Sequence, residues 1–461
     1  MPQIITTNQT ASASYTVTTS VDSDFIFIAA GVLVSNTSPV SLAYSAIGVF
    51  NDNTRIGIAG TLMTGASPAI YSLNANNIIN VTATGSIVSL ANISWDCVDF
   101  RAVGAQVFND GSITSAFRAV NSTFGDLIVF NTGLISGVAL GVGGAARVEN
   151  LGTIRGATAV AMGSGNDVLI NHGSLVGNVT LGDGKDLFDG IGGTVTGTVD
   201  GGAEDDVYRL SDPLVQVLEL AGAGLDRVEA TVSWDLGTAA EVEDLTLLGS
   251  ATNGGGNVLN NMITGNGMNN RLLGHAGLDT IHGGDGIDWI DGGSEDDQQY
   301  GGQGDDRVTG RAGADTLYGG SDDDLILGGS GGDRLYGDDG DDVLVGGAGR
   351  DVLFGGLDVD TFQFRLVLDS GVGAALRDQI VAFEAGVDIV DLKLVDANSA
   401  VNGNQAFTWI GTALFGAVAG QLRLVTGVNS ILQGDVTGDG VADFEVQMNG
   451  VATVSVNDLI L

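Results

Sequence analysis

The sequence predicts an all-β protein: a parallel β-helix, then a parallel β-roll, then a C-terminal β-rich cap. Two internal repeats and a change in charge lead to this prediction. A loose repeat of about 20 residues runs through the front part of the chain, and a strict repeat of nine follows it. Residues 1–160 carry a net charge of −3, whereas the remaining 301 residues carry −36.

The composition limits the partners of the chain. Its 461 residues include 74 Gly and 56 Asp or Glu but only 17 Lys or Arg, which gives a net charge of −39. Nucleic acid and anionic membrane surfaces repel such a chain, so a divalent cation is the expected partner. The single cysteine, Cys97, excludes an internal disulfide and a cysteine-built zinc site.

The loose repeat has the pattern Asn-x-Gly-x-apolar. Its glycines, at positions 111, 133, 152 and 173, are 22, 19 and 21 residues apart, with Gly60 and Gly85 as possible earlier members. Short β-branched runs between Asn and Gly are typical of strands with tight turns. A coil of this length favours a parallel β-helix in which Asn side chains stack and Gly adopts positive φ. A β-sandwich with regular turns is the alternative.

The strict repeat begins at Gly274 and continues through ten nonapeptides without an insertion. The first position is Gly in all ten, and the eighth is apolar in all but one, where Gln299 stands. The sixth position is always Asp: Asp279, Asp288, Asp297, Asp306, Asp315, Asp324, Asp333, Asp342, Asp351 and Asp360.

This pattern predicts calcium sites. Glycines at positions one to four allow a sharp turn with inward carbonyl oxygens, and residues seven to nine form a short strand. Carboxylate and carbonyl oxygens at this density favour calcium. Two nonapeptides make one 18-residue coil, so each Asp should stack on the Asp two repeats later. The ten Asp residues then form eight pairs, and about eight calcium ions would neutralise the net charge of −16 over residues 265–363.

The segment resembles the β-roll of the RTX (repeats-in-toxin) family, whose nonapeptide is G-G-x-G-x-D-x-U-x. Six positions depart from the glycines of that pattern. The departures are His275, Arg311 and Asp338 at position two, and Glu295, Asp322 and Asp358 at position four. Two earlier nonapeptides carry Asn261 and Asn270 in place of Asp, and we expect them to bind calcium poorly or not at all.

Three acidic turns lie upstream of the roll. Asp167, Asp186 and Asp206 are separated by 19 and 20 residues, which is the length of the predicted β-helix coil. These carboxylates should therefore stack and could hold further calcium. Exposed polar turns are the alternative.

The C-terminal region resembles the C-terminal domain of serralysin-type secreted metalloproteases. The resemblance rests on turns such as 378–383 and 434–444 and on the ending Asp458-Leu-Ile-Leu461. It implies export by a type I secretion apparatus through an uncleaved C-terminal signal, and hence an extracellular location. We do not expect the first residues to form a Sec-type signal, because they lack a basic residue and an apolar stretch. The longest apolar run, residues 25–34, is too short to span a membrane.

The sequence argues against an enzyme. The zinc site of a serralysin needs H-E-x-x-H, and none of His172, His275 and His282 precedes a Glu. The alternative is a polysaccharide lyase or epimerase with a β-helix catalytic domain. The close charged cluster in residues 1–160 is Asp96, Asp99 and Arg101, and on a strand the two Asp side chains should face opposite ways.

We therefore expect a secreted, calcium-binding, non-catalytic surface-layer, matrix or adhesive protein. Its partners would be the secretion apparatus and either a cell-surface glycan or further copies of itself. The expected domains are a β-helix over 1–210, a connecting β segment over 211–255, the roll over 256–363 and the secretion domain over 364–461.

Overall fold

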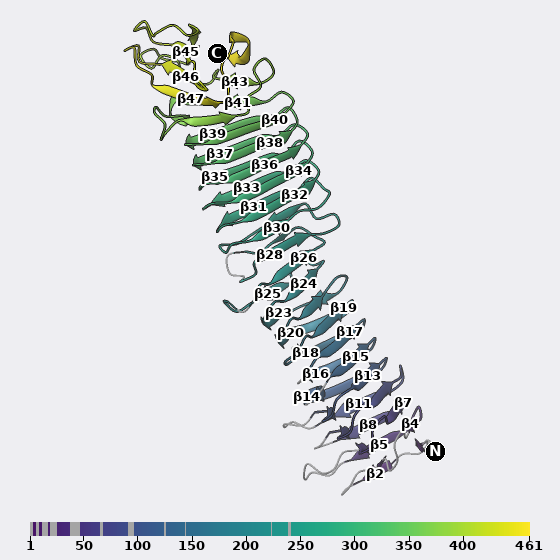
Figure 1. Ribbon diagram of the computed structural model, residues 1–461. Helices are drawn as coiled ribbons and strands as arrows, with labels where there is room; N and C mark the ends of the chain where they lie inside the picture. Colours follow the sequence, from purple (N-terminus) through teal and green to yellow (C-terminus); the bar gives the residue numbers. More distant parts are fainter. Residues whose placement is uncertain are drawn as a thin grey trace. The chain divides into compact units, whose positions relative to one another are not determined.

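The computed structural model describes residues 3–5, 9–11, 17–18, 25–36, 47–64, 68–90, 96–123, 126–142, 144–222, 224–237 and 241–461 (Figure 1). Over these residues the regular structure is β-strand, apart from two 3-10 turns, η1 (Val367–Asp369) and η2 (Val456–Asp458). The all-β prediction is confirmed. The chain divides into two compact units, 1–231 with 240–242, and 232–239 with 243–461.

The first unit is a β-helix of parallel strands. Its first face pairs each strand with the strand one coil later, so that Val129 lies beside Val148 and Leu169 beside Phe188. The strands of this face are β1 (Gln3–Ile5), β4 (Phe25–Ile28), β7 (Arg55–Ile58), β10 (Ile78–Val81), β13 (Ala105–Asn109), β15 (Leu127–Asn131), β17 (Ala146–Asn150), β19 (Val168–Asn171), β21 (Leu187–Asp189), β24 (Val207–Leu210) and β26 (Arg227–Ala230).

Two further faces complete each coil. The first and the last coils use separate short strands for them, whereas the middle coils use one long strand. Such a long strand shifts register part-way, as between Thr114 and Arg118. The short strands are β2 (Gln9–Ala11), β3 (Val17–Thr18), β5 (Leu33–Asn36), β6 (Ile47–Val49), β8 (Thr61–Thr64), β9 (Ile70–Ser72), β11 (Ser86–Ser89), β12 (Val98–Phe100), β22 (Thr194–Val195), β23 (Thr198–Ala203) and β25 (Gln216–Leu218). The long strands are β14 (Ser112–Ser122), β16 (Leu134–Val142), β18 (Thr153–Ala161) and β20 (Ser174–Asp183). The parallel β-helix is thus confirmed, and a sandwich is excluded.

The Asn-x-Gly repeat sets the register of these coils. Asn109, Asn131, Asn150 and Asn171 are fully buried. The Nδ2 of each of the first three donates to the Oδ1 of the next Asn at 2.7–2.8 Å, and the Nδ2 of Asn171 donates to the carbonyl of Thr194 at 3.2 Å. The glycines allow close approach of neighbouring coils rather than positive φ. A Cβ on Gly152, for example, would lie 2.2 Å from the carbonyl oxygen of Gly133. The predicted Asn ladder is present, and the predicted reason for the glycines was wrong.

The second unit contains the roll, in which two parallel sheets face each other across one core (Figure 1). One sheet contains β28 (Asp244–Leu247), β30 (Met262–Thr264), β32 (Thr280–Asp285), β34 (Gln298–Gln303), β36 (Thr316–Ser321), β38 (Arg334–Asp339), β40 (Val352–Leu357) and β42 (Asp378–Val381). The other contains β27 (Trp234–Asp235), β29 (Asn253–Gly255), β31 (Arg271–Ala276), β33 (Trp289–Ser294), β35 (Arg307–Ala312), β37 (Leu325–Gly331), β39 (Val343–Gly349), β41 (Thr361–Gln363), β43 (Ile389–Asp391) and β48 (Leu459–Ile460).

The pairing confirms the 18-residue coil, since Leu317 lies beside Leu335, which lies beside Leu353. The eighth-position side chains fill the core, including Gln299, whose side chain is fully buried. The strands are longer than expected. They include positions seven to nine and the first three positions of the next repeat, because the backbone ladder continues through Gly302 and Gln303. The tight turn is confined to positions four to six.

The cap continues both sheets of the roll. β42 pairs in parallel with β47 (Phe444–Asn449), which forms an antiparallel meander with β46 (Asn429–Asp435) and β45 (Gln421–Val425). β44 (Thr408–Trp409) pairs with β45, and β48 pairs with β43. Among the described residues, no helix has the length and hydropathy to cross a membrane.

Candidate metal centre

The ten predicted aspartates lie at the turns of the roll, each directly before a strand. All are at most 3% exposed. Because two repeats make one coil, the aspartates form two files. One precedes the strands of the β32 sheet (Asp279, Asp297, Asp315, Asp333 and Asp351), and the other precedes those of the β33 sheet (Asp288, Asp306, Asp324, Asp342 and Asp360).

Neighbouring aspartates in a file share one kind of contact. The Oδ1 of Asp297 accepts a 2.9 Å hydrogen bond from the backbone N–H of Asp279, one coil earlier. The same bond joins all eight predicted pairs, at 2.7–3.3 Å. The Oδ2 atom of each of the ten residues is buried and has no hydrogen-bond partner. Each file therefore contains a row of buried carboxylate oxygens to which no protein group donates.

Glycines have two different roles in these turns: those at position one leave space for the carboxylate, and those at positions two and four adopt positive φ. A Cβ on the first-position Gly310 would lie 2.2 Å from the Oδ2 of Asp315, so this glycine provides the space that the carboxylate fills. Positions two and four instead need positive φ, as in Gly302 (φ 124°) and Gly304 (φ 110°). The six residues that replace these glycines keep the left-handed backbone, with φ of 72–81°: His275, Glu295, Arg311, Asp322, Asp338 and Asp358. The turn shape is thus preserved at every departure from the pattern.

Burial raises the pKa of every aspartate in the two files. The pKa reaches about 6 in Asp315 and about 8 in Asp297, where burial is the main cause and the carboxylates of Asp279 and Asp315 add to it. The pKa values of the other eight are about 6 to about 8, also mainly through burial. A hard divalent cation would remove this cost by supplying positive charge where no donor is present. The residues present therefore fit calcium.

Asn261 and Asn270 occupy the corresponding turns at the start of the roll. The amide oxygen of Asn261 accepts from the backbone N–H of Asn257 at 2.7 Å, and its Nδ2 donates to the carbonyl of Glu243 at 3.0 Å. Asn270 makes the equivalent bonds to Asn266 and to the carbonyl of Ala251. These amides satisfy themselves within the protein, which agrees with the expectation that the two turns bind calcium poorly.

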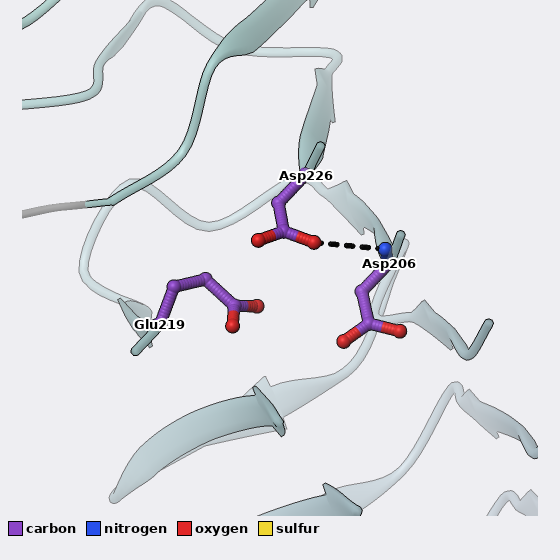
Figure 2. A group of neighbouring side chains, drawn as sticks. All are labelled: Asp206, Glu219 and Asp226. Carbon is purple, nitrogen blue, oxygen red and sulfur yellow. Dashed lines mark hydrogen bonds between the residues drawn. The ribbon is translucent and has the colours of Figure 1, made fainter. Parts of the chain in front are cut away.

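The upstream acidic turns repeat the geometry of the roll inside the β-helix. Asp167, Asp186 and Asp206 are at most 2% exposed, so they are not exposed polar turns. The Oδ1 of Asp186 accepts from the N–H of Asp167, and that of Asp206 from Asp186, both at 2.7 Å. These three aspartates form a third file, in the β-helix. Asp226, which the sequence reasoning missed, continues this file, because its Oδ1 accepts from the N–H of Asp206 at 2.9 Å (Figure 2).

Downstream, the files continue into the cap. The Oδ1 of Asp378 accepts from the N–H of Asp351 at 2.9 Å, and that of Asp388 accepts from Asp360 at 3.2 Å. The sequence reasoning missed both as site residues, since the separation grows from 18 to 27 and 28 residues. The sequence signal that could have identified Asp378 and Asp388 is an Asp followed within two residues by an Ile-Val pair.

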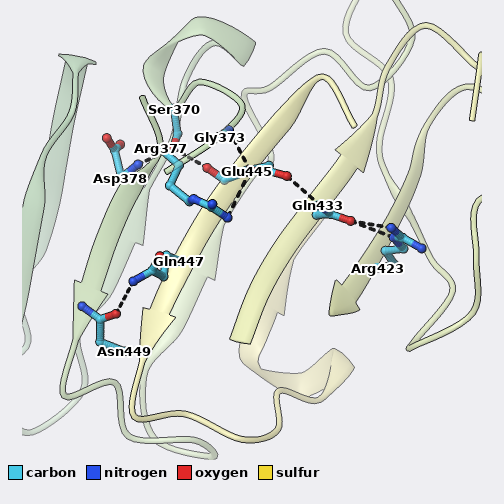
Figure 3. Close-up of polar contacts among 9 residues, drawn as sticks. All are labelled: Ser370, Gly373, Arg377, Asp378, Arg423, Gln433, Glu445, Gln447 and Asn449. Carbon is cyan, nitrogen blue, oxygen red and sulfur yellow. Dashed lines mark hydrogen bonds and ion pairs between the residues drawn. The ribbon is translucent and has the colours of Figure 1, made fainter. Parts of the chain in front are cut away.

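Asp378 is also the point where the file meets the cap (Figure 3). Ser370 accepts from the N–H of Asp378 at 2.8 Å and donates to the carbonyl of Glu445 on β47. Arg377 forms a 3.1 Å ion pair with the Glu445 carboxylate. Burial, followed by the charge of Asp351, raises the pKa of Asp378 to about 9.

The charged cluster in the β-helix contains two buried carboxylates. Asp96 precedes β12 rather than lying in it, and both Asp96 and Asp99 are buried. Arg118 donates to Asp96 at 2.7 Å, and Arg101 donates to Asp99 at 3.1 Å. Burial raises the pKa of Asp96 to about 6, and the nearby Asp99 carboxylate raises it further while Arg118 lowers it. Both carboxylates are therefore buried, and each is paired with an arginine of its own.

Comparison with known proteins agrees with the geometry of the roll. The family described as RTX calcium-binding nonapeptide repeat (4 copies) matches residues 264–299, 300–335 and 327–362. The search of curated proteins gave no match.

One solved structure similar to this chain is the solution structure of the AlgE6R3 subunit from the Azotobacter vinelandii mannuronan C5-epimerase. The similarity has 25% identity and a TM-score of 0.24, and covers 36% of this chain and 78% of that one. The family match covers the turns that hold the two files of aspartates. Residues 264–362 are therefore RTX calcium-binding nonapeptide repeats.

Proposed function

We propose that this protein is secreted, folds its roll on extracellular calcium, and acts as a non-catalytic surface-layer, matrix or adhesive protein. The observation that carries the proposal is the pair of files in which ten buried Oδ2 atoms have no donor. Such oxygens are costly in a metal-free fold and become ligands once calcium is present. Calcium would then act structurally, and the roll would be the part of the molecule that depends on it.

The number of ions follows from the stacking. Each gap between successive aspartates of a file offers one place for an ion, and the ten residues of the nonapeptides leave eight gaps. We propose about eight calcium ions there. The continuation to Asp378 and Asp388 supplies two further gaps at the cap.

The proposal includes export before folding. The resemblance of residues 364–461 to a serralysin C-terminal domain supports the use of a type I secretion apparatus. In the folded protein β48 completes a sheet, and the preceding Asp458 is buried with its Oδ1 accepting from Gly386 at 2.9 Å. A signal in this segment would be exposed only while the cap is unfolded, as low cytosolic calcium would keep it.

Calcium-dependent folding is tested on the full chain by far-UV circular dichroism and size-exclusion chromatography. In chelator we expect an expanded molecule with reduced strand signal, and millimolar calcium should restore both. Magnesium should substitute poorly because it prefers a small octahedral shell. A strand signal that is complete in chelator and unchanged by calcium would contradict the proposal.

The alternative function is a polysaccharide lyase or epimerase with its site in the β-helix. The observation that favours it is a cluster in which the buried Asp96 and Asp99 pair with the partly exposed Arg118 and Arg101. Arg101 also lies 5.7 Å from the centre of the Tyr71 ring. Arginines can neutralise a uronate, and a carboxylate with a pKa of about 6 can act as a base.

Incubation of the calcium-loaded protein with uronate polymers separates the two functions. Unsaturated ends or inverted C5 centres that disappear in Asp96→Asn would support the enzyme. Unchanged polymers together with calcium-dependent ordered assembly, or with saturable glycan binding, would support the structural role.

A further inference from the structure

We infer that the β-helix has a divalent-cation site of its own, formed by Asp206, Glu219 and Asp226. Its position at residues 201–226 lies outside the nonapeptides that match the RTX family. Each of the three side chains offers one oxygen, and the three oxygens lie within 4.8 Å of one another. Figure 2 shows the three carboxylates converging from three separate parts of the chain.

The coil that contains Asp206 copies a turn of the roll. Residues 201–206 read Gly-Gly-Ala-Glu-Asp-Asp, and residues 292–297 of the roll read Gly-Gly-Ser-Glu-Asp-Asp. The backbones also agree: φ is 113° at Gly202 and 116° at Gly293, and 75° at Glu204 and 73° at Glu295. Asp206 is therefore a sixth-position aspartate in a turn of nonapeptide shape.

Gly201, the first residue of this turn, distinguishes it from the turns of Asp167 and Asp186 in the same file. The residues five places before Asp167 and Asp186 are Met162 and Leu181, whereas Gly201 precedes Asp206. A Cβ on Gly201 would lie 2.2 Å from the Oδ2 of Asp206 and 2.6 Å from the Oε1 of Glu219. Gly201 thus leaves room for convergent oxygens, as Gly310 does beside Asp315 in the roll.

Two buried oxygens point to a bound cation. Asp206 is 1% exposed, and its Oδ1 accepts from the backbone of Asp186 while its Oδ2 has no hydrogen-bond partner. The Oε2 of Glu219 is likewise buried without a partner, although its Oε1 accepts from the hydroxyl of Tyr208. Within the part of the chain that the structure describes, neither carboxylate forms an ion pair with Lys, Arg or His. A cation is the group that would satisfy both.

The donor set selects the kind of cation. All the candidate ligands are oxygens, and three are carboxylates, so a hard divalent ion is favoured over zinc or copper. Calcium binds oxygens at about 2.3–2.6 Å and accepts irregular shells, whereas magnesium requires about 2.0–2.1 Å and octahedral geometry. Oxygens up to 4.8 Å apart fit opposite sides of a calcium shell better than those of magnesium. The site is therefore assigned to calcium.

Hydrogen-exchange mass spectrometry of the full chain tests the inference, because it reports on each segment separately. At a calcium concentration about ten times Kd, exchange in peptides spanning β23 to β26 should slow by about elevenfold relative to chelator. Glu219→Gln should abolish this slowing. Glu204→Gln removes an exposed charge from the same turn and should leave it intact.

Peptides from two other regions serve as controls for the folding of the variants and for calcium binding by the roll. Peptides of residues 127–160 show whether the β-helix of each variant is folded, and those of residues 274–362 report calcium binding by the roll. The inference would be overturned if calcium still slowed exchange of residues 198–230 in Glu219→Gln. It would also be overturned if calcium did not change the exchange of these residues in the unmodified protein. Failure of the proposed function would instead appear as roll peptides that ignore calcium. If the exchange of residues 127–160 shows that Glu219→Gln is unfolded, Tyr208→Phe is the second variant. This substitution leaves all three carboxylates in place, so calcium must still slow exchange in the peptides of residues 198–230.

Discussion

The carboxylate of Asp315 joins two coils of the roll, because its Oδ1 accepts a 2.9 Å hydrogen bond from the backbone N–H of Asp297, eighteen residues earlier. The N–H of Asp315 in turn donates to Asp333, also at 2.9 Å. The Oδ2 of Asp315 is buried without a partner. Asp315 therefore stands between two successive gaps of one file and contributes to both.

This position predicts the effect of Asp315→Asn. The substitution keeps an oxygen for the Asp297 N–H but replaces the free carboxylate oxygen by an amide, so two neighbouring calcium sites lose charge. We expect the calcium midpoint of folding, followed by circular dichroism, to rise several-fold. Asp285→Asn is the control, because Asp285 has an exposed third-position side chain. Equal midpoints for the two variants would show that total negative charge, rather than the register of Asp, governs binding.

The metal-free protein should be most stable in mild acid. The pKa of an unfolded Asp is about 3.9, whereas the pKa values of the files are raised to between about 6 and about 8. Between these values the folded state binds more protons, so stability falls as the pH rises from about 4 to about 8. Far-UV circular dichroism in chelator across this range should therefore show a strand signal of the roll that decreases as the pH rises.

Calcium should reverse that trend, because its ligands must be deprotonated and it competes with protons. In millimolar calcium we expect Tm to rise or stay level over the same pH range. A metal-free strand signal that rises steadily with pH would contradict the raised pKa values.

Two glycine-to-alanine variants should behave in opposite ways. In Gly310→Ala the new Cβ would lie 2.2 Å from the Oδ2 of Asp315 and 2.7 Å from the carbonyl oxygen of Gly328. We expect a loss of about 1–3 kcal/mol in the stability of the calcium-bound protein and a higher calcium midpoint of folding. In Gly332→Ala the Cβ meets nothing closer than 3.5 Å, at the Arg350 carbonyl.

The Gly332→Ala protein should accordingly be unchanged or more stable, by about 0.4–1 kcal/mol, because alanine restricts the unfolded chain. Urea unfolding of both variants in millimolar calcium measures the difference in stability, and calcium titration measures the midpoints. Similar destabilisation by the two substitutions would show that space beside the carboxylate is not the reason for the first-position glycine.

Gln299 should be replaceable with a gain in stability. Its side chain is fully buried in the core of the roll, where neither its amide nitrogen nor its oxygen has a partner. Gln299→Leu removes two unsatisfied polar groups and should stabilise the roll by about 1–3 kcal/mol. The reciprocal Leu317→Gln, one coil later, should destabilise it. Denaturation of each variant in calcium checks both, and a less stable Gln299→Leu would indicate that the amide is satisfied in the folded protein.

The β-helix should depend on its Asn ladder. Asn131 accepts from Asn109 and donates to Asn150, both at 2.7 Å. Asn131→Ala leaves a buried donor and a buried acceptor without partners, so we expect a loss of about 1–3 kcal/mol for each. The loss should appear in exchange protection of β13 to β19 and be independent of calcium. Faster exchange in the roll instead would show that the two repeats are coupled.

Much of the fold was predictable because its repeats are regular. The constant interval of nine residues is enough to predict the coil length, the partner of each Asp and the buried eighth position. Where the interval changes, the prediction failed: Asp378 and Asp388 continue the files after 27 and 28 residues. Strand length was also underestimated, since positive φ at positions two and four does not interrupt the ladder through positions one to three.

The sequence by itself determined the all-β class, the parallel stacking and the aspartates of the roll, because these depend on local periodicity and on the shape of a glycine turn. Only the tertiary structure decided which groups meet across coils of unequal length. It placed Glu219 beside Asp206 and Asp226, although they lie 13 and 7 residues apart from it in no repeated pattern. It also paired Asp96 with Arg118, which lies 22 residues later in the chain. Such contacts depend on where the chain turns, and a turn in an irregular coil is set by packing against its neighbours.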